Sequence, residues 1–192
     1  MFQTRLHLND LLLNQVRETK LLGVILTDDL KWQRNTENLT KRAYKRISIL
    51  HKLVNFNVDR KETLHIYILY IRSILEQSCV VWGTSLTDTE SQALERVQKC
   101  ALRIIYQTDY INYSHALELS GLPELSKRRL QLIHKFAEKC IKNEKTKTMF
   151  PLNEHAVNTR QKEKFSVPFA YHERLKNSAL VYMTNYPNIK YK

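Results

Sequence analysis

The sequence predicts a mainly α protein, a helical bundle of about five helices preceded by a small antiparallel β remnant and followed by an irregular basic C-terminal tail. Apolar residues recur with a helical period from residue 31 to about residue 143, and the flanking segments lack this period. With 192 residues, 43% of them hydrophobic, the chain can bury a core. We expect a β remnant at 1–30, a helical domain at 31–143 and a basic extended tail at 144–192.

Three apolar segments near the N-terminus predict short strands: Arg5–Leu8, Leu11–Val16 and Lys20–Leu26. The dipeptide Asn9-Asp10 separates the first two and favours a turn. We therefore expect a small antiparallel sheet.

The first two helices are predicted by apolar stripes. The first begins near Trp32, and its stripe consists of Leu39, Ala43, Ile47, Leu50 and Val54. Asp59 is suited to cap the second. That helix is apolar on most sides, through Leu64, Tyr67, Ile68, Ile71, Ile74 and Leu75. We expect it to be the buried central helix.

Local signals predict three further helices. Thr87 and Glu90 form a capping-box pattern, and the stripe that follows is Ala93, Val97, Cys100, Ala101 and Ile104. Ser114 is expected to cap a short helix that ends near Gly121. Pro123 and Glu124 open another, with Leu130, Ile133, Ala137, Cys140 and Ile141 on one side. Beyond about residue 143 the chain is basic and interrupted by prolines, which predicts little regular structure.

The charge balance favours an anionic partner. Lys and Arg outnumber Asp and Glu by 31 to 19, a formal net charge of +12. The longest apolar stretch, around Leu64–Leu75, contains His65 and Arg72 and is shorter than the ~20 residues that span a bilayer. The N-terminus has no secretory leader pattern. We expect no membrane partner and, with three widely spaced cysteines, a reducing intracellular location in the cytoplasm, the nucleus or both.

Cations recur along single faces of three predicted helices, an arrangement suited to successive phosphates. On the first helix they are Arg34, Lys41, Lys45 and Lys52, with Arg42 and Arg46 beside them. On the third they are Arg96, Lys99 and Arg103, and on the fifth Arg128, Lys135, Lys139 and Lys142. Solvated helix faces favour Lys and Arg in any case, but three such faces and the net charge together favour nucleic acid. Tyr44, Tyr67, Tyr70, Tyr106 and Tyr110 could stack on bases, although we expect most of them in the core.

The sequence offers no catalytic or metal site and no cofactor site. Asp28-Asp29 precede the first helix, where capping is favoured over a two-metal site because no second acid with a matching setting follows. No histidine is followed two residues later by Asp or Glu, as the iron site of a dioxygenase requires. The three glycines are isolated, so a nucleotide-binding loop is absent.

Three segments together resemble the non-LTR (LINE/jockey-like) retrotransposon reverse transcriptases. Leu21–Trp32 resembles the segment that closes the palm and opens the thumb of these enzymes. The thumb helices are similar to Ile71–Glu76, Val81-Trp82, Leu94–Lys99 and Ala101–Ile105, and the C-terminal part is similar to Arg128-Arg129, Phe165–Pro168 and Lys176–Ser178. Asn35 and Gln77 depart from the residues common at their positions.

The resemblance implies a non-catalytic thumb fragment that grips a template–primer, either an RNA–DNA hybrid or a duplex. Fingers, palm acids and any endonuclease would lie before Met1. Leu22, Gly23 and Val24 would lie near the primer terminus, where Gly23 permits close backbone approach. Charge pattern and resemblance coincide at Arg42, Lys45, Arg46, Lys99 and Arg103.

Two alternatives remain beside the thumb fragment. Val16–Leu53 is also similar to the N-terminal domain of alkylated-DNA-repair AlkB homologue eight, whose full-length form implies 2-oxoglutarate-dependent dioxygenase and tRNA methyltransferase activity. This chain lacks the motifs for both chemistries. The other alternative is a helical scaffold or interaction protein whose charge serves solubility.

Overall fold

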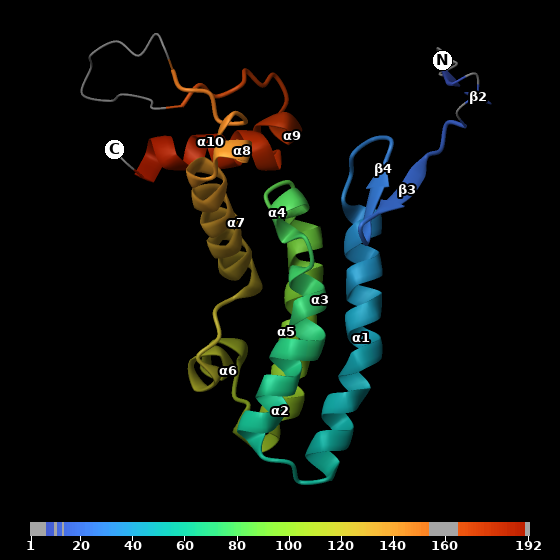
Figure 1. Cartoon of the computed structure of the whole chain (residues 1–192). Helices are drawn as coiled ribbons and strands as arrows, with labels where there is room; N and C mark the ends of the chain where they lie inside the picture. Colours follow the sequence, from blue (N-terminus) through green and yellow to red (C-terminus); the bar gives the residue numbers. More distant parts are fainter. Residues whose placement is uncertain (1–6, 10, 13, 154–164, 191–192) are drawn as a thin grey trace.

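The computed structural model describes residues 7–9, 11–12, 14–153 and 165–190 (Figure 1). Two antiparallel strand pairs come first, β1 (His7–Leu8) with β2 (Leu11–Leu12) and β3 (Glu18–Leu21) with β4 (Val24–Thr27). The elements that follow are α1 (Gln33–Asn55), α2 (Arg60–Ile66), η1 (Tyr67–Arg72), α3 (Ser73–Glu76), α4 (Cys79–Trp82), α5 (Asp88–Tyr106), η2 (Gln107–Asp109), α6 (Tyr113–Ser120), α7 (Leu125–Lys142), α8 (Glu144–Lys147), α9 (Glu173–Lys176) and α10 (Ala179–Lys190). The predicted fold class, a helical bundle after a small antiparallel β remnant, is confirmed.

The hairpin of β3 and β4 corrects one predicted strand. Lys20–Leu26 does not form a single strand, because the chain reverses at Leu22 and Gly23, whose φ angles are 49° and 87°. Positive φ at both central residues belongs to a tight hairpin turn. The apolar Leu22 concealed this turn in the sequence. Part of the predicted Arg5–Leu8 strand lies outside the described residues.

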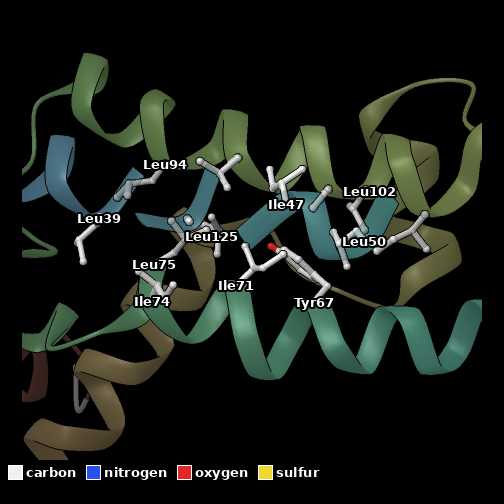
Figure 2. Packing of buried hydrophobic residues seen from close by; sticks show 14 of the residues in the cluster. Leu39, Ile47, Leu50, Tyr67, Ile71, Ile74, Leu75, Leu94, Leu102 and Leu125 are labelled. Carbon is white, nitrogen blue, oxygen red and sulfur yellow. The ribbon is translucent and has the colours of Figure 1, made fainter. Parts of the chain in front are cut away.

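Three long helical stretches form the main core. Leu39, Ala43, Ile47 and Leu50 of α1 are buried, as predicted. Figure 2 shows Leu39, Ile47 and Leu50 packed with Leu94 and Leu102 of α5 and with side chains of the central helix. The N-terminal parts of α1 and α5 line one cavity, so the two helices run parallel, and the central helix packs against both in the opposite direction.

The central helix differs from its prediction in one turn. The predicted continuous helix is present as α2, η1 and α3, but η1 is a π-helical turn. Such a turn inserts an extra residue and rotates the faces that follow it. Tyr67, Ile71 and Leu75 are all buried across this rotation.

The helix ends test the predicted caps. The Asp59 carboxylate accepts from the Lys61 N–H at the start of α2, and the Thr87–Glu90 capping box of α5 is complete. The predicted cap at Ser114 is wrong, because the Asn112 side chain accepts from the His115 N–H and α6 begins one residue earlier. Gly121 ends α6 with φ of 65°.

Helix α7 presents a different face from the predicted one. Leu130 is 37% exposed, although it was expected in the core. Arg129 is buried in its place, at 3% exposure, and its guanidinium donates to the Ser91 hydroxyl across 2.7 Å. The stripe of Ile133, Ala137 and Cys140 therefore continues toward the N-terminus through Arg129, which sequence reasoning places in solvent.

The prediction of little regular structure after residue 143 is wrong for α10. This helix packs against α7 (Figure 1), and its Val181 and Met183 are buried. Phe150 and Phe165, from the segments before α10, meet edge to face at 6.4 Å in the same small core. Pro187 lies inside α10 and weakened the helical signal in the sequence.

Gly23→Ala should destabilise the protein through two separate effects. Its φ of 87° strains any side chain, and an added Cβ would lie 2.3 Å from the Gln77 side-chain nitrogen. We expect a loss of about 2 kcal/mol in unfolding free energy, measured by urea denaturation. Gly121→Ala is the matched control, since φ is also positive there but no atom lies within 4 Å. Equal losses at both positions would show that the Gln77 contact contributes nothing.

Candidate nucleic-acid interface

The outer face of α1 carries three of the predicted phosphate-binding cations. Lys41, Lys45 and Lys52 are exposed and lie on the side of the helix opposite its buried stripe. Arg34 is also exposed, but its guanidinium is shared between two acids, with nitrogens 3.8 Å from both Glu18 and Glu37. The net positive charge on this face therefore begins after Glu37.

Helix α5 adds a second group of exposed cations, Arg96, Lys99 and Arg103. The Lys99 ammonium lies 5.0 Å from the centroid of the Tyr113 ring, which directs it toward α6. Partial burial, followed by the proximity of Cys100, raises the pKa of the Tyr44 phenol on α1, and the positive charge of Arg96 on α5 opposes that rise. Arg96 is therefore within electrostatic reach of Tyr44. We call Lys41, Lys45, Lys52, Arg96 and Arg103 the basic face.

Arg42 and Arg46 lie beside this face and are held by the central helix. The Arg42 guanidinium donates to the Gln77 side-chain oxygen across 3.0 Å and is half-buried. The Arg46 guanidinium donates to the Tyr70 carbonyl across 2.8 Å and lies 5.7 Å from the Tyr70 ring centroid. Both arginines therefore tie α1 to the central helix.

Leu22, Gly23 and Val24, the three residues expected near a primer terminus, differ in exposure within the hairpin. Leu22 is 89% exposed at the turn, whereas Val24 is 7% exposed and packs in the core. Gly23 approaches Gln77 rather than open solvent. Of this group, Leu22 alone exposes its side chain to solvent.

The cations of α7 are divided between a half-buried ion pair and the surface. The Arg128 guanidinium lies 3.3 Å from a Glu76 oxygen, and that same oxygen accepts from Arg72 across 2.6 Å. Lys135 and Lys139 line a shallow cavity beside Glu76 and Cys79. Glu76 therefore neutralises part of the positive charge of this group on α7.

The tyrosines are divided between core and surface. Tyr67 and Tyr106 are buried and Tyr110 packs partly against the core, as expected, whereas Tyr44 and Tyr70 are exposed. Tyr67 donates to the Gln98 side-chain oxygen across 2.8 Å, and Gln98 donates in turn to Tyr113, whose hydroxyl bonds to Glu95. Burial raises the pKa of Tyr67. Sequence reasoning missed this buried network, since Gln98 is an ordinary surface residue in most helices.

Asp29 organises the loop before α1 instead of capping the helix, so that prediction is wrong. Its carboxylate accepts from the Thr27 hydroxyl and the Lys31 N–H, and lies 2.8 Å from the Lys31 ammonium. The side-chain contact with Lys31, followed by that with Thr27, holds the pKa of this carboxyl well below its usual range. Trp32, at the start of α1, makes no side-chain cap.

Within the described residues, no group of three or more His, Cys, Asp or Glu is arranged to hold a metal ion. Cys79, Cys100 and Cys140 are unpaired, and burial raises the pKa of the Cys79 thiol to about 11. None of the helices in the described part of the chain has the length and apolar character that crossing a bilayer requires. Comparison with protein-family models, curated proteins and solved structures gives no match to this chain.

Arg46 and Lys45 are adjacent on α1 but differ in their contacts: the Arg46 guanidinium bonds to the central helix, whereas Lys45 lies on the outer face. Arg46→Gln should lower the unfolding free energy by about 1 kcal/mol, because it removes the bond to the Tyr70 carbonyl and the contact with its ring. Lys45→Gln, one residue away and exposed, should change it by less than about 0.5 kcal/mol. Chemical denaturation followed by circular dichroism measures both. The assignment of Arg46 to the bundle fails if the two variants are equally stable.

Proposed function

We propose that this chain is a non-catalytic, nucleic-acid-binding helical domain that grips an RNA–DNA hybrid or duplex through its phosphates, as a polymerase thumb does. One observation carries the proposal. Neither helix adds an acid to the basic face, because α1 has no Asp or Glu after Glu37 and α5 has none after Glu95. A surface of this kind attracts a polyanion over a Debye length of ~10 Å.

The spacing of the cations suits a phosphate backbone. Lys41 and Lys52 are 11 residues apart, which is roughly 16 Å along an α-helix. A duplex carries on the order of ten phosphate charges over that length. Long, exposed Lys and Arg side chains can adjust to such a row without reading the bases. Tyr44, 45% exposed between the cations, can add contact with a sugar or an unpaired base.

The alternative of a charged scaffold makes a different prediction about where the acids should lie. A face that serves solubility gains from interspersed charges of both signs. The exposed parts of α2 and α7 follow that pattern, with Arg60 paired to Asp109 and Lys127 to Glu124. The basic face departs from it, which favours an anionic partner there.

Binding to an RNA–DNA hybrid should depend steeply on salt. If the five cations of the basic face contact phosphates, the slope of log K against log salt is about −4.5. Fluorescence anisotropy of a labelled hybrid between 50 and 200 mM salt should then show an affinity loss of roughly several hundredfold. The combined variant Lys41→Gln, Lys45→Gln and Arg96→Gln should reduce the slope by roughly 2.7 and keep the helical circular dichroism.

The control replaces the same number of cations elsewhere. Lys142, Lys145 and Lys147 are exposed at the end of α7 and in α8, away from α1 in Figure 1. Changing all three to Gln alters the net charge equally and should leave the slope within about one of the parent value. If both triple variants lose affinity alike, net charge alone drives binding and the proposed grip is refuted. A parent protein whose binding is insensitive to salt supports the scaffold instead.

A further inference from the structure

The two edges of the β3–β4 hairpin differ in how their backbone groups are satisfied. At the outer edge of β4, the Ile25 N–H donates to the buried Asn35 side-chain oxygen across 3.2 Å. This bond shows that Ile25 points its N–H away from β3. In an antiparallel ladder, the residue opposite also points its backbone groups outward. That residue is Lys20, which faces Ile25 in the register.

The outer edge of β3 is therefore defined by Glu18 and Lys20. The Asp28 N–H donates to the Arg17 carbonyl across 2.9 Å, which fixes Arg17, Thr19 and Leu21 as the residues bonded to β4. All four residues of β3 are exposed. In the described part of the chain, β3 pairs with β4 alone, and nothing covers its other edge. An uncovered edge of this kind is a template for another strand.

The side chains on this edge are complementary to a second copy of themselves. An antiparallel partner strand must match outward residues with outward residues. When Thr19 faces Thr19 across a two-fold axis, Glu18 of each copy faces Lys20 of the other. Moving the axis by one residue would place Glu18 opposite Glu18, or Lys20 opposite Lys20. Opposite charges directly across a ladder stabilise it, and like charges destabilise it.

We propose that two copies of this chain associate through the outer edges of β3, forming a four-stranded antiparallel sheet in the order β4–β3–β3–β4 with Thr19 at the two-fold axis. Glu18 and Lys20 of each copy exchange backbone hydrogen bonds with Lys20 and Glu18 of the other, and their side chains form two ion pairs. This surface is separate from the basic face, so the proposal does not rest on nucleic-acid binding.

The helices leave room for this sheet. Val24 and Leu26 pack toward the core, so α1 covers one face of the hairpin at β4. Strands lie ~4.8 Å apart, which separates the two β4 strands by roughly 14 Å. An α-helix with side chains is ~10–12 Å wide, so two copies of α1 fit side by side on the same face. The interface is small, and the dimer should be weak and reversible.

Sedimentation equilibrium of the nucleic-acid-free chain tests this dimer. The parent protein should show monomer–dimer exchange at concentrations from about 10 µM to about 1 mM, as expected for so small an interface. Glu18→Lys places lysines opposite each other twice and should raise the dissociation constant roughly tenfold or more. The double variant Glu18→Lys, Lys20→Glu restores both pairs with reversed polarity and should recover the parent value.

Two further variants test whether dimerisation depends on the outer edge of β3 or on the contact between Glu18 and Arg34. Glu18 also lies near Arg34, so Glu37→Lys, which removes the other acid at Arg34, should leave dimerisation unchanged. Lys20→Pro removes an outward N–H without touching the bonds to β4, and should abolish the dimer with unchanged circular dichroism. A parent protein that is monomeric at every concentration overturns the proposal. So does a dimer that survives Lys20→Pro, or a charge reversal that fails to restore Glu18→Lys.

Discussion

The parallel packing of α1 against α5 determines which side chains of this protein meet solvent. Two small residues, Ala43 on α1 and Ala101 on α5, are fully buried in the main core. Close packing at a small residue fixes the rotation of each helix about its own axis. Once Leu39 and Leu50 face inward, the lysines on the opposite side of α1 must face outward. The basic face is thus a consequence of how the core is packed.

The distribution of the few acidic residues accounts for the rest of the electrostatic pattern. Glu76 bonds to Arg72 and Arg128, and Glu95 bonds to Tyr113 and to the Leu125 N–H. Glu90 completes a helix cap. Carboxylates used between helices and at helix starts satisfy partners that burial would otherwise leave unpaired. Neither helix therefore adds an acid after Glu37 on α1 or Glu95 on α5, and the five cations of the basic face have no acid among them on these two helices.

Helical periodicity predicted the main helices and the cations on them, because a stripe of period 3.6 is a local property of the sequence. Helical periodicity does not show which cations bond to a neighbouring helix and which remain available at the surface. Arg46 and Lys45 are neighbours in the sequence, yet only Arg46 reaches the central helix, since that depends on where another helix lies. The same limit applies to Arg129, a buried charged residue whose guanidinium donates to Ser91 on another helix. The Leu22–Gly23 turn was missed because leucine with positive φ is uncommon.

Asn35 connects the β3–β4 hairpin to α1. It is 1% exposed in the first turn of α1, and its side chain holds the Ile25 N–H of the hairpin. The bond satisfies one outward N–H of β4 and connects the hairpin to the helix that carries the lysines. A hairpin without such an anchor would be marginal in water, since two strands alone bury little surface. The open edge of β3 is therefore held in a defined position relative to the basic face. Two copies joined at that edge would present two basic faces in a fixed two-fold arrangement, which raises the effective concentration of the second face for any polyanion long enough to reach both.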